Sequence, residues 1–172
     1  MIETFFLRRY DSPLGTYILV SSQRGVVCVA LEDGSGAHLA QWERDGIRIQ
    51  DGGEHNDTVA DQLDAYFAGR LCQFSVPLDL RGTPFQRRVW GLLSDIPYGE
   101  TRSYGQIAHA LGRPNCARPV GQAIARNPVA IIVPCHRVIG SNGKRTGYGD
   151  GLHRKQALLE LEAAVRLTNS VS

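Results

Sequence analysis

Near residue 82 the chain changes both its charge and its hydrophobic pattern. Residues 1–80 carry 6 Lys and Arg against 12 Asp and Glu, whereas residues 81–155 carry 12 against 3. The formal net charge of +2 therefore hides an acidic first half and a basic second half. A basic segment indicates a polyanion-binding domain, although a solvated basic face would look the same. We expect two domains, over 1–80 and 81–172, that meet at the turn RGTP.

Short runs of branched and aromatic residues fill the first third of the chain. The runs TFFLRRY, TYILVSS and VVCVALED are separated by the turns DSPLG and QRG, which predicts three antiparallel strands. Val59, Leu63 and Phe67 then recur at steps of four, as on the apolar face of a helix that covers a sheet. The segment FSVPLDL, at 74–80, is either a further strand or an extended connector.

Two capping boxes mark helix starts in the second half. Thr83 and Ser103 each stand three residues before a glutamine. The helix from 104 ends at Gly112, and the connection RPN leads to a second helix within CARPVGQAIAR. Two short helices joined by a tight turn in a basic segment predict a helix-turn-helix, with an ordinary helical hairpin as the alternative. The last helix, in HRKQALLELEAAV, turns Leu158, Leu161 and Val165 inward.

A candidate nucleophile follows the apolar run AIIVP, which we expect to be a strand at 130–134. Cys135 is followed by His136 and Arg137, a base and a positive charge that could stabilise a thiolate. A thiol of ordinary pKa, about 8.5, is only a few per cent ionised at neutral pH. In an extended segment Cys135 and His136 point to opposite sides, so a link between them needs a turn or a bridging water. Alone, the pair is a weak signal, because buried cysteines are mostly core residues.

The remaining cysteines and the composition exclude several classes of protein. The four cysteines show neither a CxxC pair nor the histidine spacing of a zinc site, so we expect no metal. Reduced thiols are expected rather than two disulfides, because 172 residues can bury a sufficient core. No run approaches the roughly 18 apolar residues of a membrane span, and the N-terminus lacks a signal pattern. We expect a soluble cytoplasmic protein.

Four segments around Cys135 resemble the O6-alkylguanine-DNA alkyltransferase family, also called methylated-DNA–protein-cysteine methyltransferases. They are GTPFQRRVW, IPYGETRSYGQIA, IVPCHRVIG and TGYGDGLHRKQALLELE, which span residues 82–162 almost continuously. The core PCHR, with Asn127 eight residues before the cysteine, is the most specific part. The resemblance implies an α+β fold: an RNase H-like N-terminal domain with a small antiparallel sheet and a covering helix, and a mostly helical C-terminal domain with a helix-turn-helix and an active-site loop.

The resemblance also implies DNA repair by direct reversal. An alkyl group on O6 of guanine, and also on O4 of thymine, would pass irreversibly and once per molecule to Cys135. The partner would be double-stranded DNA with alkylated guanine, bound through the minor groove without strong sequence preference and without a cofactor or membrane. We expect a monomer in solution, with binding along DNA either independent or cooperative.

The family's catalytic roles fall on matching positions of this chain. Cys135 would accept the alkyl group, His136 would deprotonate it through a water, Glu162 would fix the tautomer, Asn127 would brace the turn, and Tyr104 would donate to guanine N3. The damaged base would meet the carbonyls of Cys135 and Val138, the wall formed by Tyr148 and the amide of Gly149. DNA contacts would come from Ala117, Arg118, Gly121 and Gln122, with Arg118 filling the gap left by a flipped nucleotide.

Two residues depart from the family pattern. Pro119 stands where alanine is expected after Arg118, and a proline pushes the residue before it away from helical geometry. Such a proline is tolerable only near the start of the helix. Asp150 replaces a glycine beside the alkyl pocket and adds a side chain that can carry a negative charge where the alkyl group should sit. This predicts that large adducts fit poorly.

Three other functions share part of this pattern. A lesion sensor related to the family would lack the acceptor cysteine, a helix-turn-helix regulator would not need PCHR, and a cysteine hydrolase would need an oxyanion hole. Taken singly, Tyr104, Tyr148, Glu162 and Arg118 are each explained as packing or surface residues. Their joint spacing around PCHR favours repair.

Overall fold

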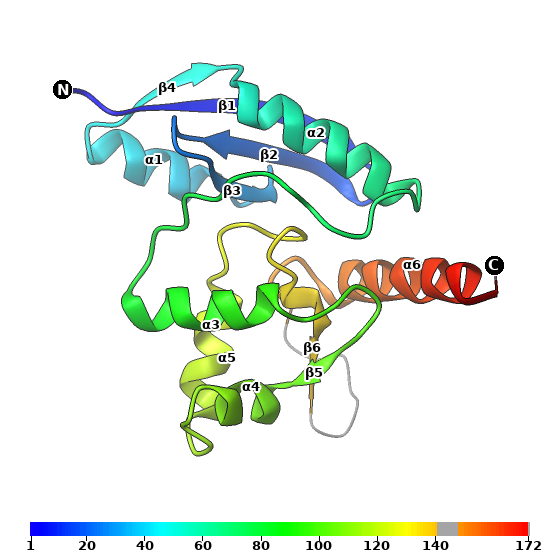
Figure 1. Ribbon diagram of the computed structural model, residues 1–172. Coiled ribbons are helices and arrows are strands. Elements are labelled where there is room, and N and C mark those ends of the chain that lie inside the picture. The colour runs from blue at the N-terminus through cyan, green and yellow to red at the C-terminus, as the bar shows by residue number, and fades with distance from the viewer. Residues whose placement is uncertain (141–147, 172) are drawn as a thin grey trace. The chain divides into compact units, whose positions relative to one another are not determined.

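The computed structural model describes residues 1–140 and 148–171 and contains two compact units, Met1–Arg81 and Gly82–Ser172. The first unit is built on a four-stranded sheet and the second is mostly helical, so the α+β class is confirmed (Figure 1). None of the helices in the described ranges is both long and apolar enough to cross a membrane.

The sheet of the first unit has the order β3-β2-β1-β4. The strands β1 (Thr4–Ser12), β2 (Gly15–Ser21) and β3 (Val26–Leu31) form the predicted antiparallel meander. The expectation of a purely antiparallel sheet is wrong, because β4 (Arg48–Asp51) pairs parallel with β1. A parallel neighbour requires a crossover, and the helix α1 (Gly36–Arg44), which the sequence pattern did not indicate, lies in that connection.

Each face of the sheet has a helical cover. Ile18 and Val20 point to the face where Leu39 and Trp42 of α1 pack. The alternate residues Tyr17 and Leu19 are also fully buried, so they point to the opposite face.

The cover of that second face is α2 (Glu54–Phe67), which contacts β1 and β2. It buries Val59 and Leu63, as predicted. The third inward residue is Tyr66, however, and Phe67 is only partly buried, because a turn of 3.6 residues places position 66 closer to the sheet.

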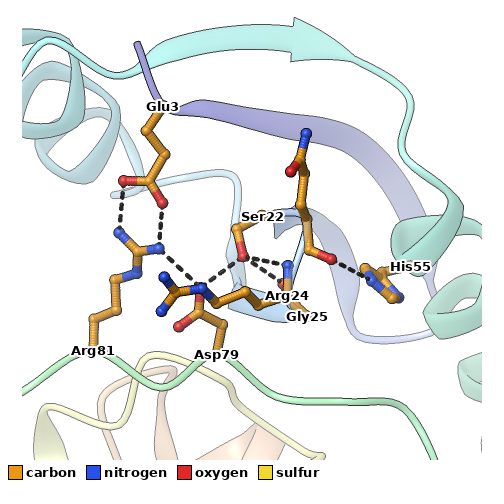
Figure 2. A network of polar contacts seen from close by, with 8 residues as sticks. Glu3, Ser22, Arg24, Gly25, His55, Asp79 and Arg81 are labelled. Carbon is orange, nitrogen blue, oxygen red and sulfur yellow. Dashed lines mark hydrogen bonds and ion pairs between the residues drawn. The ribbon is translucent and has the colours of Figure 1, made fainter. Parts of the chain in front are cut away.

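The segment 74–80 is an extended connector, one of the two predicted alternatives. The Val26 amide donates to the Pro77 carbonyl at 2.9 Å, and the Asp79 amide donates to the Val26 carbonyl at 2.8 Å. Gly25 permits this approach, because a Cβ at that position would lie 2.5 Å from the Pro77 carbonyl oxygen. The connector ends in a polar network in which Arg81 bonds both Asp79 and Glu3 (Figure 2).

The second unit begins with two capped helices. The capping boxes at Thr83 and Ser103 both form and start α3 (Pro84–Ser94) and α4 (Tyr104–Ala110), as predicted. Gly112 follows α4 with a φ of 75°, which suits the predicted helix end. The helix α5 (Ala117–Ala125) packs against α3 and α4, and the Trp90 indole of α3 donates to the Ala123 carbonyl of α5 at 2.8 Å.

The rest of the second unit surrounds Cys135. A single 3-10 turn, η1 (Cys135–Arg137), leads into β6 (Val138–Ile139), which pairs parallel with β5 (Arg102–Ser103). The last helix, α6 (Leu152–Val171), buries Leu158 as predicted. Leu161 and Val165 are only partly buried, because the inward face of α6 is occupied by Lys155, Leu159 and Glu162.

Candidate active site

The segment before Cys135 is a series of tight turns, so the prediction of a strand at 130–134 is wrong. Its amides bond carbonyls only two to four residues back, as when the Cys135 amide donates to the Val133 carbonyl at 2.8 Å. Ile131 has a φ of 72°, a left-handed conformation that is rare for a branched residue and costs about 1–3 kcal/mol. Local turn geometry held from outside the segment therefore overrides the β propensity of AIIVP.

Asn127 holds these turns together. Its Nδ2 donates to the Val133 carbonyl at 2.8 Å, and its Oδ1 accepts from the Val129 amide at 3.0 Å. The same side chain bonds Cys135, which lowers the pKa of the thiol. Asn127 thus ties both ends of the turn to the nucleophile, in the position expected of a brace.

The 3-10 turn at Cys135–Arg137 brings His136 against α6. The His136 Nε2 lies 2.7 Å from Glu162 Oε2, and both side chains are buried. A carboxylate can only accept, so Nε2 carries the proton of the neutral imidazole. Nδ1 is buried and has no hydrogen-bond partner in the described part of the chain. The arrangement leaves one imidazole lone pair ready to accept a proton.

Burial moves the thiol and the imidazole in opposite directions. It raises the pKa of Cys135 to about 11, and the negative charge of Asp150 adds to this effect, while Asn127 and Lys155 oppose it. Burial lowers the pKa of His136, against the attraction of Glu162. In the protein without substrate the thiol is therefore protonated at neutral pH, because desolvation outweighs the nearby positive charge that the sequence suggested would stabilise a thiolate.

Tyr104 stands at the first position of α4, close enough to Cys135 for the thiolate charge to act on it. Burial, and then that charge, raise the pKa of its phenol, so the hydroxyl keeps its proton at neutral pH and can donate. Gly121 of α5 lies against this ring, because a Cβ at 121 would be 3.8 Å from the Tyr104 ring carbons. A residue assigned from sequence to DNA contact thus also borders the site.

Lys155 is a residue of the site that sequence reasoning missed. It is fully buried on α6, and its Nζ donates to the Val138 carbonyl. Its positive charge favours the Cys135 thiolate, and burial lowers its own pKa. The signal was its spacing, since Lys155 stands seven residues before Glu162, two helical turns along the same face.

The carbonyls expected to face the damaged base already hold one donor each. Val138 O accepts from Lys155, and Cys135 O accepts from the Val138 amide. A carbonyl oxygen has two lone pairs, so one such bond does not by itself prevent either carbonyl from accepting from a ligand.

The other residues predicted around the base lie just before α6. Tyr148 is partly buried, whereas Gly149 is exposed and a Cβ there would meet no atom within 4 Å. Asp150 is partly buried and its own pKa is raised by burial. Its charge acts on the Cys135 thiol, so Asp150 lies near the sulfur.

The helix α5 presents its first residues to solvent. Ala117 and Arg118 are its first two residues, and both are exposed. Pro119 is the third, and the first bond of the helix runs from the Val120 amide to the Cys116 carbonyl at 3.0 Å. The proline therefore removes no hydrogen bond, and Arg118 is helical, contrary to the expected displacement.

Five arginines of the second unit are exposed on α3, in the connection between α4 and α5, and at the two ends of α5. They are Arg87, Arg88, Arg113, Arg118 and Arg126. Beside them is a hollow of about 210 Å³, lined by Thr83, Phe85, Gln86, Pro119, Gln122, Ala123 and Arg126. This exposed basic surface is of the kind that binds phosphates. Within 1–140 and 148–171, the side chains of His, Cys, Asp and Glu form no group of three that could hold a metal.

Comparison with known proteins agrees with both halves of this description. Residues 84–164 match the model for the DNA-binding domain of 6-O-methylguanine DNA methyltransferase, and residues 6–80 match that for its ribonuclease-like domain. A Mycobacterium leprae methylated-DNA–protein-cysteine methyltransferase is 50% identical over 162 residues, which cover 94% of each chain. The Mycobacterium tuberculosis protein of that name is 69% identical over 104 residues, which span 60% of this chain and 63% of the relative.

Solved structures give the same result. The Mycobacterium tuberculosis O6-methylguanine methyltransferase has 48% identity and a TM-score of 0.81, with 93% of each chain covered. A Mycobacterium tuberculosis protein in complex with DNA has 47% identity, the same TM-score and 94% coverage of each chain. The family resemblance noted in the sequence is confirmed: the chain belongs to the 6-O-methylguanine DNA methyltransferase family.

Proposed function

We propose that this protein repairs DNA by transferring an alkyl group from O6 of guanine to Cys135. The observation that carries the proposal is the His136 imidazole, which directly follows Cys135. Its Nε2 is bound to Glu162, and its Nδ1 has no hydrogen-bond partner among residues 1–140 and 148–171. Family membership supplies the substrate class, because the relatives are named for methyl transfer from DNA to a protein cysteine.

The transfer balances without a cofactor. His136 Nδ1 takes the thiol proton of Cys135, directly or through a water, and Glu162 stabilises the imidazolium. The sulfur attacks the alkyl carbon, the bond from carbon to O6 breaks, and the electron pair moves into the guanine ring. The Tyr104 hydroxyl donates toward N3, where that charge develops. The guanine anion then takes up one proton, which balances the one that His136 removed from the thiol and returns to solvent or base. The products are neutral guanine and S-alkylcysteine, a stable thioether, so each molecule acts once.

Access to the alkylated O6 requires the nucleotide to leave the base stack. Extrusion costs a few kcal/mol of lost stacking and pairing, which Arg118 would offset by filling the gap. The exposed arginines around α5 would contact phosphates and hold the helix in the minor groove. The second domain, 81–172, would thus carry both DNA binding and transfer, acting as a monomer on alkylated guanine and on O4-alkylthymine.

The test uses a duplex oligonucleotide with one O6-methylguanine. After incubation, mass spectrometry should find one added methyl group on the peptide that contains Cys135, with repair that stops at one lesion per protein molecule. Cys135→Ser should abolish repair, and the matched control Cys72→Ser, at an exposed cysteine, should leave it intact. Lesion binding without added mass would instead indicate a sensor, and repeated turnover would indicate a hydrolase.

Arg118 offers a separate test of base extrusion. Arg118→Ala should slow repair in duplex DNA at least tenfold, because its loss leaves the gap in the stack unfilled. Reaction with free O6-methylguanine base needs no extrusion and should be unchanged. An equal loss with both substrates would exclude the proposed role, and Arg87→Ala, on the exposed side of α3, is the matched control for lost positive charge.

A further inference from the structure

Arg137 is buried and makes contacts that sequence reasoning did not anticipate. Its Nε donates to Glu162 Oε1 at 2.8 Å and its Nη2 donates to Oε2 at 3.0 Å, so the guanidinium grips both oxygens. The same Oε2 lies 2.7 Å from His136 Nε2. The side chain of Arg137 is 8% exposed and that of Glu162 is 1% exposed, so solvent weakens this interaction little.

The remaining contacts of Arg137 fix the guanidinium in place. Its Nη1 donates to the Ile96 carbonyl at 2.8 Å, and its Cζ lies 5.5 Å from the centre of the Tyr98 ring. The Gly99 amide donates to Glu162 Oε1 at 3.2 Å, from the same loop. Arg137 is therefore held by the loop at 96–99 and by α6, and it makes the Glu162 carboxylate face His136 in one orientation.

This placement differs from the role that the sequence suggested for Arg137. A positive charge beside Cys135 was expected to stabilise the thiolate, but the cation that most favours that thiolate is Lys155. Arg137 acts instead on the pair formed by His136 and Glu162. It lowers the pKa of both partners, which disfavours uptake of a proton by either of them.

We propose that Arg137 is the positioning residue that keeps the pair of His136 and Glu162 unprotonated and correctly oriented, and so sets the lower pH limit of alkyl transfer. The proposal rests on the proposed function, because His136 must act as a base for that limit to exist. Arg137 contacts neither the thiol nor the substrate in this scheme. Its effect passes through the carboxylate to the imidazole.

The other groups around His136 do not replace this effect. Glu162 and Lys155 face it from α6, and Cys135 precedes it in the turn. Lys155 also lowers the pKa of His136, but its Nζ donates to the Val138 carbonyl, whereas Arg137 donates to both oxygens of the Glu162 carboxylate. The helix α3, which packs against η1, contributes buried apolar side chains such as Trp90 and Leu93.

The experiment measures the single-turnover rate of methyl transfer to Cys135 from pH 5 to pH 9. In Arg137→Gln the acid limb of the profile should move to higher pH by on the order of one unit, the usual effect of removing one close charge. In Arg137→Lys the charge remains but the paired hydrogen bonds are lost. The rate at high pH should then fall several-fold, with the acid limb within a few tenths of a unit of its original position.

Arg166→Met is the matched control. Arg166 is exposed on α6 and donates to the Gly99 carbonyl at 3.1 Å, so it contacts the same loop from a position open to solvent. Its profile should coincide with that of the unaltered protein.

The outcomes separate this proposal from the proposed function. An acid limb that stays in place in Arg137→Gln while the rate falls would reduce Arg137 to a structural role. If Arg137→Gln does not fold, a shift of a full unit in Arg137→Lys would overturn the proposal instead. No transfer by the unaltered protein at any pH would contradict the proposed function itself.

Discussion

Without DNA, Cys135 should behave as a thiol that is protonated at neutral pH. Burial raises its pKa to about 11, whereas a short unstructured cysteine peptide has a pKa of about 8.5. At pH 7 the protein thiol should therefore be ionised roughly 300 times less than the peptide thiol. The rarer thiolate is also more nucleophilic, by about 10- to 18-fold for this difference in pKa. The net expectation is an alkylation rate about 20- to 30-fold below that of the peptide.

The assay follows iodoacetamide labelling of the Cys135 peptide by mass spectrometry from pH 6 to pH 10.5. The rate should rise about tenfold per pH unit across most of this range, whereas the free peptide levels off near its pKa of about 8.5. The position of the plateau is the diagnostic quantity, because restricted access lowers the rate at every pH without moving it. Unfolding the chain in urea should restore the profile of the free peptide. A plateau below about pH 9 in the folded protein would refute the reasoning.

Three further substitutions test other parts of the site. Asp150→Asn removes a negative charge that raises the pKa of the Cys135 thiol, so the midpoint of the same labelling profile should move to lower pH. Glu162→Gln leaves Arg137 buried without a charged partner and should lower the free energy of unfolding by about 3–5 kcal/mol, measured in urea. Folding lowers the pKa of Glu162, so the stabilisation that its ionised form gives is present above the unfolded pKa of about 4.3 and is lost as the pH falls. Glu162→Gln should therefore lose less stability in acid than the original protein. Ser103→Ala removes the N-cap of α4 and should cost about 1 kcal/mol in the same urea assay.

The elements that could be predicted from sequence are those whose signal is local. The capping boxes at Thr83 and Ser103 need only four consecutive residues, and both form. The helix α1 carries no such signal, because its N-cap Ser35 makes no side-chain capping bond and none of its residues is fully buried. The strand β4 has four residues, too few for a period of two to be distinguished from chance.

In the candidate site, too, the features with a local sequence signal could be predicted and those that depend on tertiary packing could not. The sequence motif located Cys135, His136 and Glu162, and the structure brings the last two together. The motif gave no indication that burial affects the pKa of the Cys135 thiol more than the surrounding charges do. That balance depends on how α6 packs against the turn at Cys135. For the same reason Lys155, an ordinary helical lysine by sequence, is a buried cation in the structure.

The charge states of Cys135 and His136 also distinguish the proposed transfer from hydrolysis. In papain-like hydrolases the thiolate exists before substrate binds, with a thiol pKa of about 3–4. Here the thiol has a pKa of about 11 and the imidazole a pKa below its ordinary value of 6.5, so moving the proton from sulfur to nitrogen costs at least about 6 kcal/mol in the empty site. The bound substrate must offset that cost. It can do so only during the transfer itself, when the negative charge of the sulfur passes on to an acceptor. In the proposed reaction the guanine ring is that acceptor, beside the neutral Tyr104 hydroxyl. A thiol that ionises only during transfer is protected from other alkylating agents, and the single use of Cys135 in the proposed reaction would require that protection.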